Sequence, residues 1–231
     1  MEKLKVLDLF SGIGGFSLGL ERTCGFETVA FCEIEAFPRK VLAKHWPNVP
    51  CYDDVRTLTA ERLAADGIRV DAICAGFPCQ GISIAGKALG LSDPRSGLWG
   101  DTLRLVSELE PRIVLLENSA MLLARGIGDI LGGLAAIRYD AEWHCIPAGN
   151  LGAPHERDRI WIVAYPNGER CGQYHRPPPS QFHRSSPGIP IILAMKAGRR
   201  LGNKSLRRFA EWMMGYADGW TSLDSCTLET P

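Results

Sequence analysis

The sequence predicts an α/β protein whose largely parallel β-sheet is covered by helices on both faces. From residue 4 to residue 164, short apolar runs alternate with stretches of helical character, and this alternation is typical of a parallel sheet. The first apolar run also leads directly into a glycine-rich turn that opens a helix. With 231 residues, of which 45% are hydrophobic and 23% charged, the chain is long enough to bury one normal core.

The individual elements follow from the apolar runs and from the residues that interrupt them. The third strand, for example, is an apolar run that ends at Gly76, and the second helix is stopped by Pro47. Strands are expected at residues 4–10, 27–32, 70–75, 112–116, 141–146 and 160–164, and helices at residues 15–23, 36–45, 60–66, 101–109 and 129–137.

The alternation breaks at Pro166, which we interpret as the end of a first domain. The stretch 166–190 contains six prolines and little periodicity, as expected of a loop or linker. Between residues 166 and 208, nine Lys and Arg stand against one acid, Glu169, although the net charge of the chain is zero. Such a basic block is typical of a phosphate-binding face, and a solvated linker is the alternative. The expected organisation is a domain at 1–165, a basic target-recognition segment or linker at 166–200, and a C-terminal helix (205–214) with a tail within 201–231.

Cysteine usage and hydropathy exclude several classes of protein. The eight cysteines show no CxxC pairing, which argues against a disulfide framework or a zinc ribbon, and no metal site is expected. The N-terminus leads straight into an apolar strand, with no secretory leader and no apolar span of 18 residues. We therefore expect a soluble cytoplasmic protein that does not interact with a membrane.

A nucleoside site is predicted where the first strand enters its glycine turn. The glycines of Ser11-Gly12-Ile13-Gly14-Gly15 let the backbone turn sharply and approach a ligand closely. Glu33 ends the second strand, where a carboxylate can grip a ribose diol, and Asp53 or Asp54 could receive the amino group of an adenine. The turn lacks the GxGxxG spacing, so a nucleoside without phosphates fits better than NAD. The alternative is that these carboxylates are ordinary strand-end acids.

A nucleophilic cysteine is predicted in Ala75-Gly76-Phe77-Pro78-Cys79-Gln80, just past a buried strand. Because a free thiol is only weakly ionised at neutral pH, the site must supply positive charge or activate its target. Glu117, at the end of the fourth strand, could share a proton with N3 of a pyrimidine. Arg157 and Arg159 come just before the last strand and point to one side, so they could hold a phosphate, a base carbonyl or the cysteine loop. Taken singly, each of these residues also fits an inert loop or a solvated sheet edge.

Taken together, these motifs resemble the cytosine-C5 DNA methyltransferase family. The resemblance runs in order from residue 6 to about residue 164 and rests on DLFSGIGG, Glu33, Asp54, AGFPCQGISIAGK, ENS and HERDRIWIV. It implies a Rossmann-like, S-adenosylmethionine-dependent methyltransferase fold, with residues 1–165 as the catalytic and cofactor-binding domain. It also implies a short enzyme of bacterial or prophage type that acts on double-stranded DNA, typically within a restriction–modification system.

The resemblance further implies a role for each motif residue. Cys79 would add to C6 of a cytosine flipped out of the duplex, and this covalent adduct would make C5 nucleophilic toward the methyl group. Glu117 would contact N3 and the exocyclic amine, Arg159 the carbonyl side of the base, and Arg157 the cysteine loop, while residues 80–100 would close on DNA. S-adenosyl-L-methionine would be bound by Phe10, Ser11, Gly12, Ile13, Gly14, Gly15, Glu33, Ile34, Asp54, Val55 and Pro78.

The chain departs from the family's pattern at several positions. Ser119 replaces the usual valine after Glu-Asn, and His155 stands where the arginine motif begins with glutamine. The segment 166–200 is short for a target-recognition region, and the closing Gly-Asn-Ser element is not found in its usual place. Two alternatives follow: a catalytically impaired remnant that binds DNA or the cofactor, and an RNA cytosine-C5 methyltransferase. We expect a monomer, with a partner subunit if the chain is incomplete.

Overall fold

A computed structural model describes residues 2–78, 97–151, 153 and 157–168, together with the single residues 216, 220 and 223. Cys79, the basic segment beyond residue 168 and the predicted helix at 205–214 lie outside this described part. The chain divides into two compact units, and nearly all of the described sheet belongs to the first, Met1–Cys145 with Arg159–Tyr174. The second unit comprises Ile146–Asp158 and His175–Pro231. The three domains expected from the sequence stay a prediction.

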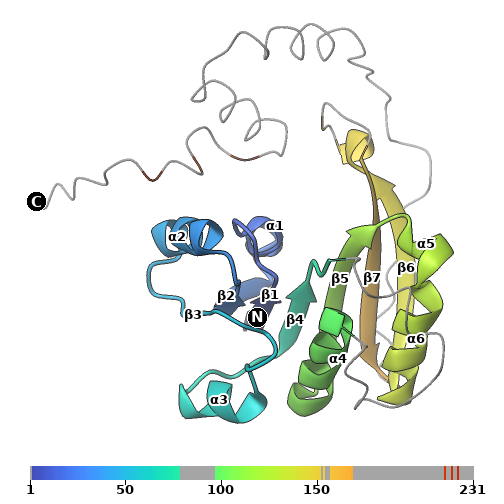
Figure 1. Ribbon diagram of the computed structural model, residues 1–231, viewed down its shortest axis with the longest axis horizontal. Helices are drawn as coiled ribbons and strands as arrows, with labels where there is room; N and C mark the ends of the chain where they lie inside the picture. Colours follow the sequence, from blue (N-terminus) through green and yellow to red (C-terminus); the bar gives the residue numbers. More distant parts are fainter. Residues whose placement is uncertain are drawn as a thin grey trace, which may run out of the picture. The chain divides into compact units, whose positions relative to one another are not determined.

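Seven strands of the described part form a single sheet. They are β1 (Leu4–Leu9), β2 (Phe26–Cys32), β3 (Cys51–Tyr52), β4 (Ala72–Ala75), β5 (Ile113–Ser119), β6 (Tyr139–Pro147) and β7 (Asp158–Pro166). Their order in the sheet is β3-β2-β1-β4-β5-β7-β6 (Figure 1). The five strands from β3 to β5 run parallel, and β7 pairs antiparallel with β5. From β1 the chain adds strands β2 and β3 on one side, and it then adds β4 and β5 on the other side of β1. Open α/β sheets bind their ligands at the carboxyl ends of the strands at the point where the strand order reverses in this way.

Helices cover both faces of this sheet, as the sequence predicts. They are α1 (Gly15–Arg22), α2 (Ala36–His45), α3 (Ala60–Ala65), α4 (Gly97–Leu109), α5 (Leu122–Arg125), α6 (Ile127–Ala136) and a 3₁₀ turn, η2 (Ala148–Leu151). In Figure 1, α1 and α2 lie on one side of the sheet and α3 and α4 on the other. Side chains of β1 alternate accordingly, because Val6 packs with Phe16 of α1, whereas Leu7 and Leu9 join the core beneath α3 and α4.

The structure extends several predicted elements and adds β3, α5 and η2. β5 continues to Ser119 instead of ending at residue 116, because its antiparallel pairing with β7 runs on until Ser119 lies opposite Arg159. Glu117 therefore lies within a strand and not beyond its end, and Arg159 lies within β7. α4 begins at Gly97 and not at residue 101. β3 and α5, with two and four residues, are too short to leave a periodic pattern in the sequence.

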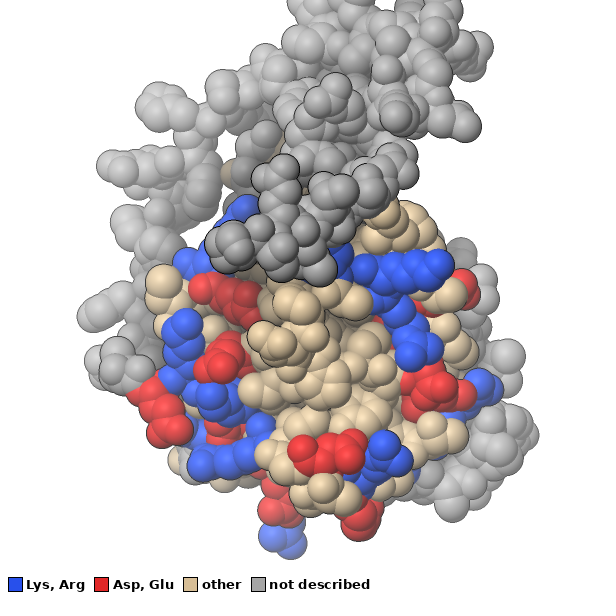
Figure 2. Space-filling view, turned by 90° about the vertical axis from the view of Figure 1, so that its left-hand side faces the viewer, with Lys and Arg blue, Asp and Glu red and all other residues tan. Residues whose placement is uncertain are grey.

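The surface carries charges of both signs. On the face shown in Figure 2, basic and acidic side chains are interspersed around an uncharged centre. Within the described ranges, ion pairs join Arg62 to Asp66 at 2.9 Å and Lys5 to Glu27 at 2.6 Å. The uniformly basic block predicted from the sequence falls almost wholly on residues beyond 168. None of the helices in the described part is long and apolar enough to cross a membrane.

Candidate active site

The turn between β1 and α1 is shaped by left-handed backbone conformations. Phe10, Gly12 and Gly14 have φ angles of 56°, 53° and 87°, in the region that favours glycine. Ser11 ties the turn to the end of β2, because its N–H donates to the Cys32 carbonyl at 3.3 Å and its hydroxyl accepts from the Cys32 N–H at 3.3 Å. The predicted cofactor turn is thus a bent segment fixed between two parallel strands.

Gly12 and Gly14 are glycines for different reasons. A Cβ on Gly14 would lie 2.5 Å from Cζ3 of Trp46 and 3.1 Å from Cδ2 of Leu42, so glycine lets the turn pack against α2 and the residue after it. A Cβ on Gly12 would meet no atom within 4 Å. The space beside Gly12 is therefore open to a ligand.

The carboxylate of Glu33 faces the turn from the end of β2. Oε2 accepts the N–H of Gly12 at 2.8 Å, and Oε1 accepts the N–H of Glu35 at 2.8 Å. Glu33 is only 8% exposed. A carboxylate offers about four lone-pair sites, so each oxygen can accept another hydrogen bond while it holds the backbone. Glu33 can therefore fix the turn and bind a diol at the same time.

Two apolar side chains stand exposed beside Glu33. Ile34 is 62% exposed and Phe37, the second residue of α2, is 52% exposed. Apolar surface next to a carboxylate suits a flat heterocycle with polar substituents. Ile34 is one of the predicted cofactor residues. Phe37 is not, although an aromatic residue in the first turn after a strand-end acid is a usable sequence signal.

Asp54, the predicted partner of an adenine amine, is paired with Arg56. The guanidinium donates from Nε to Oδ1 at 2.9 Å and from Nη2 to Oδ2 at 2.6 Å, and these hydrogen bonds lower the pKa of Asp54. Val55 between them is buried, and Arg104 of α4 donates to its carbonyl at 2.9 Å. Asp54 thus lies ionised on a segment that α4 holds in place. The role of Arg56 was not predicted, although its spacing from Asp54 permits a local ion pair.

The segment that follows β4 is anchored from β5. The Nδ2 of Asn118 donates to the Phe77 carbonyl at 2.9 Å, and the ring of Phe77 packs against Trp99 with 5.4 Å between the centroids. Asn118 and Phe77 are buried, whereas Pro78 is exposed. Cys79 lies directly beyond, outside the described residues. The sequence pattern assigned Asn118 no role of its own, because the bond depends on how β4 and β5 pair.

Glu117 and Arg159 form an ion pair at the same edge of the sheet. The Nε of Arg159 donates to Oε1 of Glu117 at 2.6 Å, and both side chains are about one quarter exposed. Oε2 of Glu117 lies 3.4 Å from the point where a Cβ on Gly76 would stand. The structure therefore brings two predicted catalytic residues together beside the segment that leads to Cys79. Arg157 belongs to the second unit, where its carbonyl accepts the N–H of Ala148 at 3.1 Å.

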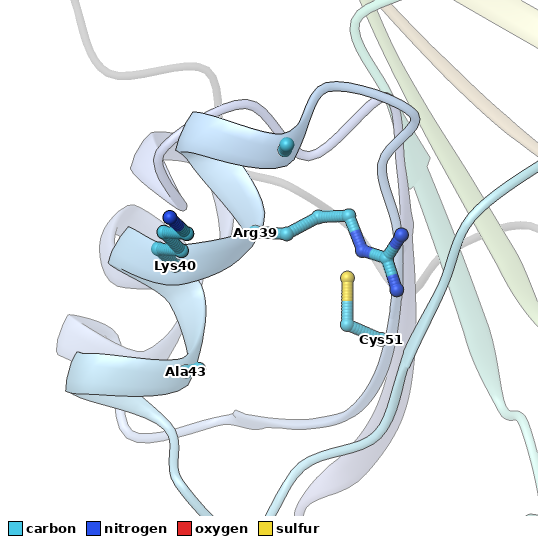
Figure 3. A pocket seen from close by; sticks show the side chains of 5 residues that line it. Arg39, Lys40, Ala43 and Cys51 are labelled. Atoms are coloured by element: carbon cyan, nitrogen blue, oxygen red, sulfur yellow. The ribbon is translucent and has the colours of Figure 1, made fainter.

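A hollow of about 350 Å³ lies elsewhere, between α2 and β3 (Figure 3). It is lined by Ala36, Arg39, Lys40, Ala43 and Cys51, and none of the predicted site residues is among them. Figure 3 shows the Arg39 guanidinium beside the Cys51 thiol. Burial nevertheless raises the pKa of Cys51, so this thiol is a poor nucleophile.

The remaining thiols and acids do not form a metal site in the described part of the chain. No group of three or more His, Cys, Asp or Glu side chains is arranged there to hold a metal ion. Cys32 lies beside the turn, and burial raises its pKa to about 12, which leaves it protonated and inert. The five cysteines of the described ranges are free. Among them, burial makes the Cys32 and Cys51 thiols poor nucleophiles.

Known proteins are similar to this chain over most of its length. A family model described as C-5 cytosine-specific DNA methylase matches residues 4–201. The chain is 37% identical over 162 residues to the Type II methyltransferase M.CviJI of Paramecium bursaria Chlorella virus IL3A, covering 69% of this chain and 42% of that protein. It is 31% identical over 212 residues to the Type II methyltransferase M.Bsp6I of Bacillus sp. (strain RFL6), covering 89% of this chain and 63% of that protein.

Solved structures share the fold as well. The crystal structure of DNMT2 from Spodoptera frugiperda superposes with a TM-score of 0.61 at 22% identity, covering 75% of this chain and 53% of that one. This likeness confirms the Rossmann-like fold expected from the sequence. The chain spans about half the length of the proteins that it matches.

Proposed function

The chain belongs to the C-5 cytosine-specific DNA methylase family, and we propose that it transfers a methyl group from S-adenosyl-L-methionine to C5 of cytosine in double-stranded DNA. The observation that carries this proposal is the position of Glu117, which lies beside Gly76 and is ion-paired with Arg159. Three motifs that are distant in the sequence thereby converge at one edge of the sheet, and this edge is where α/β folds carry their chemistry.

The residues around the β1 turn fit the cofactor. Glu33 has lone pairs free for the ribose hydroxyls, the side of Gly12 is open, and Ile34 offers an apolar surface for the adenine. Asp54 keeps acceptor capacity for the adenine amine while Arg56 holds it ionised. When bound, the cofactor supplies an electrophilic methyl group on a sulfonium. The other residues proposed to line this site are Phe10, Ser11, Ile13, Gly14, Gly15, Val55 and Pro78.

The proposed chemistry begins at Cys79, whose thiolate adds to C6 of a cytosine flipped out of the duplex. An ion-paired carboxylate only accepts hydrogen bonds, so Glu117 first accepts from the exocyclic amine, and after it takes a proton from solvent it donates toward N3. As the C–S bond forms, the electrons of the C5=C6 double bond shift toward N3, and the resulting enamine is nucleophilic enough at C5 to take the methyl group. Water takes the C5 proton, the C5=C6 double bond forms again, and the Cys79 thiolate leaves C6 to release 5-methylcytosine.

Arg159 is proposed to orient Glu117 and to reach the carbonyl oxygen of the base. Its guanidinium has five N–H donors in a planar fork, and the one on Nε bonds Glu117. Arg157 is proposed to support the loop that carries Cys79. The protein would act as a cytoplasmic monomer, and size-exclusion chromatography with light scattering would test the oligomeric state.

Transfer of tritiated methyl groups from S-adenosyl-L-methionine to unmethylated duplex DNA tests the function. We expect incorporation by the wild type and none by Cys79→Ser, which lacks the nucleophile but should still bind the cofactor. Cys24→Ser is the matched control, because this thiol is exposed at the end of α1. Equal incorporation by wild type and Cys79→Ser would refute the mechanism. A folded wild type that binds cofactor but transfers nothing would point to the impaired remnant, and transfer to tRNA alone would point to the RNA enzyme.

A further inference from the structure

Asp54 opens a tight turn in the connection between β3 and α3. This connection, residues 53–59, contains neither helix nor strand. The carbonyl of Asp54 accepts the N–H groups of Thr57 and Leu58, each at 3.1 Å, and the side chains of Val55 and Leu58 are buried. These two hydrogen bonds are local, so the placement of the turn against the rest of the fold depends on contacts with other elements.

Arg104 of α4 bonds this turn at two points. Its Nη2 donates to the Val55 carbonyl at 2.9 Å, and its Nη1 donates to the Leu58 carbonyl at 3.0 Å. Val55 follows Asp54 directly, and Leu58 ends the turn. A guanidinium is planar and holds its N–H donors in a fixed fork, so it can bond two carbonyls at a set separation. One side chain therefore links both parts of the turn to α4.

Two acids of α4 hold the guanidinium in this position. Nη1 of Arg104 also donates to Oε1 of Glu108 at 2.8 Å, and Oδ1 of Asp101 lies 3.7 Å from Nη2. The Arg104 side chain is 29% exposed, so these ion pairs are only partly screened. The other carboxylate oxygen of Glu108 accepts the N–H of Ala60, the first residue of α3, at 3.0 Å. Side chains of α4 thus bond the turn and the start of α3 together.

The helix that carries Arg104 is itself fixed by packing. α4 lies on the same side of the sheet as α3 (Figure 1). Its buried residues are Trp99, Thr102, Leu103, Leu105 and Val106. The contacts that Arg104 makes with the turn are additional to this packing. Loss of the guanidinium should therefore leave α4 in place and release the turn, whose partly buried carbonyls would lose their donors.

We propose that Arg104 is a positioning residue for the adenine end of the cofactor: by holding the Val55 and Leu58 carbonyls, it places the Asp54 carboxylate where the exocyclic amine of adenine reaches it. The inference rests on the proposed function for the identity of the cofactor. Because a hydrogen bond weakens steeply when its atoms separate or tilt, a shift of the turn lowers the affinity for adenine. Arg104 acts through the turn and not on the reacting atoms.

Two ligands that differ only in the adenine amine test this role. Isothermal titration calorimetry would measure binding of S-adenosyl-L-homocysteine and of its purine analogue, in which a hydrogen atom replaces the amine. The wild type should prefer the ligand with the amine on the order of tenfold, because Asp54 accepts a hydrogen bond from it.

Arg104→Met, which keeps an unbranched apolar stem and removes the N–H donors, should remove this preference. We expect it to weaken binding of S-adenosyl-L-homocysteine on the order of tenfold and binding of the purine analogue by less than about twofold. Arg104→Lys keeps the positive charge but not the planar fork, so it should show a smaller loss of preference, about threefold.

The kinetics of methyl transfer separate positioning from a general loss of structure. In Arg104→Met the KM for S-adenosyl-L-methionine should rise, while kcat at saturating cofactor should stay within about twofold of the wild type. Arg62→Met is the matched control. The Arg62 guanidinium is exposed on α3 and pairs with Asp66 one helical turn further on, so this variant should change neither KM nor kcat.

A double variant shows whether Arg104 acts through Asp54. Asp54→Asn should itself weaken binding of S-adenosyl-L-homocysteine. Combined with Arg104→Met, it should give a loss no larger than that of the more damaging single variant, because both changes remove the same hydrogen bond to the amine. Additive losses would place the action of Arg104 elsewhere and overturn the inference.

Other outcomes are equally decisive. Equal loss of both ligands in Arg104→Met, or no loss of either, would refute the positioning role, and if this variant does not fold, the ratio in Arg104→Lys decides. A wild type without preference for the amine would refute the role of Asp54 and the inference with it. A wild type that binds neither ligand would refute the cofactor assignment as well. A protein that shows the predicted ratios but transfers no methyl group would refute the proposed catalysis and support the inference.

Discussion

At the scale of single residues, the contact between Gly14 and Trp46 decides what the turn tolerates. A Cβ at Gly14 would stand 2.5 Å from the Trp46 ring, and the backbone is left-handed there. We expect Gly14→Ala to lower the free energy of unfolding by about 3 kcal/mol, from overpacking together with backbone strain. Urea denaturation would measure this loss.

Gly12→Ala is the matched control for that variant. Gly12 shares the left-handed conformation but has open space around it, so the expected loss is only about 1 kcal/mol. Similar losses in Gly12→Ala and Gly14→Ala would show that strain, and not the Trp46 contact, governs both positions.

The buried carboxylate of Asp8 predicts an unusual dependence of stability on pH. Its pKa is raised from 3.8 to about 6 in the folded protein, so the folded state binds the proton more tightly than the unfolded state. The stabilising contribution of this group is therefore complete below about pH 4 and is lost as pH rises through about 6, to a total of about 3 kcal/mol.

Asp8→Asn isolates this titration from those of all other groups. Relative to Asp8→Asn, the wild type should lose unfolding free energy steadily between about pH 4 and about pH 6, and the difference should be constant above that range. Urea unfolding of both proteins across this range is the measurement. Parallel pH profiles for the two proteins would contradict the prediction.

At the scale of elements, the bond from Asn118 to Phe77 joins the ends of β5 and β4. Removing the Asn118 side chain leaves the buried Phe77 carbonyl without a donor, at a cost of about 2 kcal/mol. We expect Asn118→Ala to reduce kcat for methyl transfer by at least about tenfold, because the segment before Cys79 loses its anchor, with little change in cofactor affinity.

Asn48→Ala, at an exposed position after α2, is the control for this variant. It should change neither kcat for methyl transfer nor the affinity for the cofactor. If Asn118→Ala weakens cofactor binding as much as it slows transfer, the anchor acts on the whole site and not on the cysteine segment alone.

Long periodic elements were predictable from the sequence, and contacts that depend on strand register were not. The helix at residues 36–45 matches α2 because Pro47 and its apolar spacing mark it locally. Glu33 and Glu117 are predicted as site residues because each stands in a recognisable motif, and these roles stay predictions. The partners of Glu117 and Asn118 follow from the pairing of β5 with β7 and β4, which no local pattern encodes. The burial of Asp8 and its bond to Ser17 were not predicted, although Asp8 is the one acid in the strand β1.

At the scale of the whole molecule, cofactor binding should be coupled to folding. The glycine turn, Glu33 and Asp54 come from three separate segments that meet only in the folded sheet, so the unfolded chain has no such site. S-adenosyl-L-methionine at about 100 times its Kd should therefore raise the free energy of unfolding by about 2.7 kcal/mol. Thermal unfolding with and without ligand would measure this as a rise in Tm, and an unchanged Tm would contradict the cofactor assignment.

The position of β7 has a consequence for how the protein is made. Strands β5 and β6 leave the ribosome before β7, yet β7 lies between them in the finished sheet. The two earlier strands cannot adopt their final positions by pairing with each other. The edge of β5 that pairs with β7 therefore stays without its final partner until residue 166 has emerged. The nascent chain therefore presents unpaired strand edges during translation, when aggregation is a hazard. Arg159 arrives with this last strand, so Glu117 gains its partner only when synthesis of the sheet is complete.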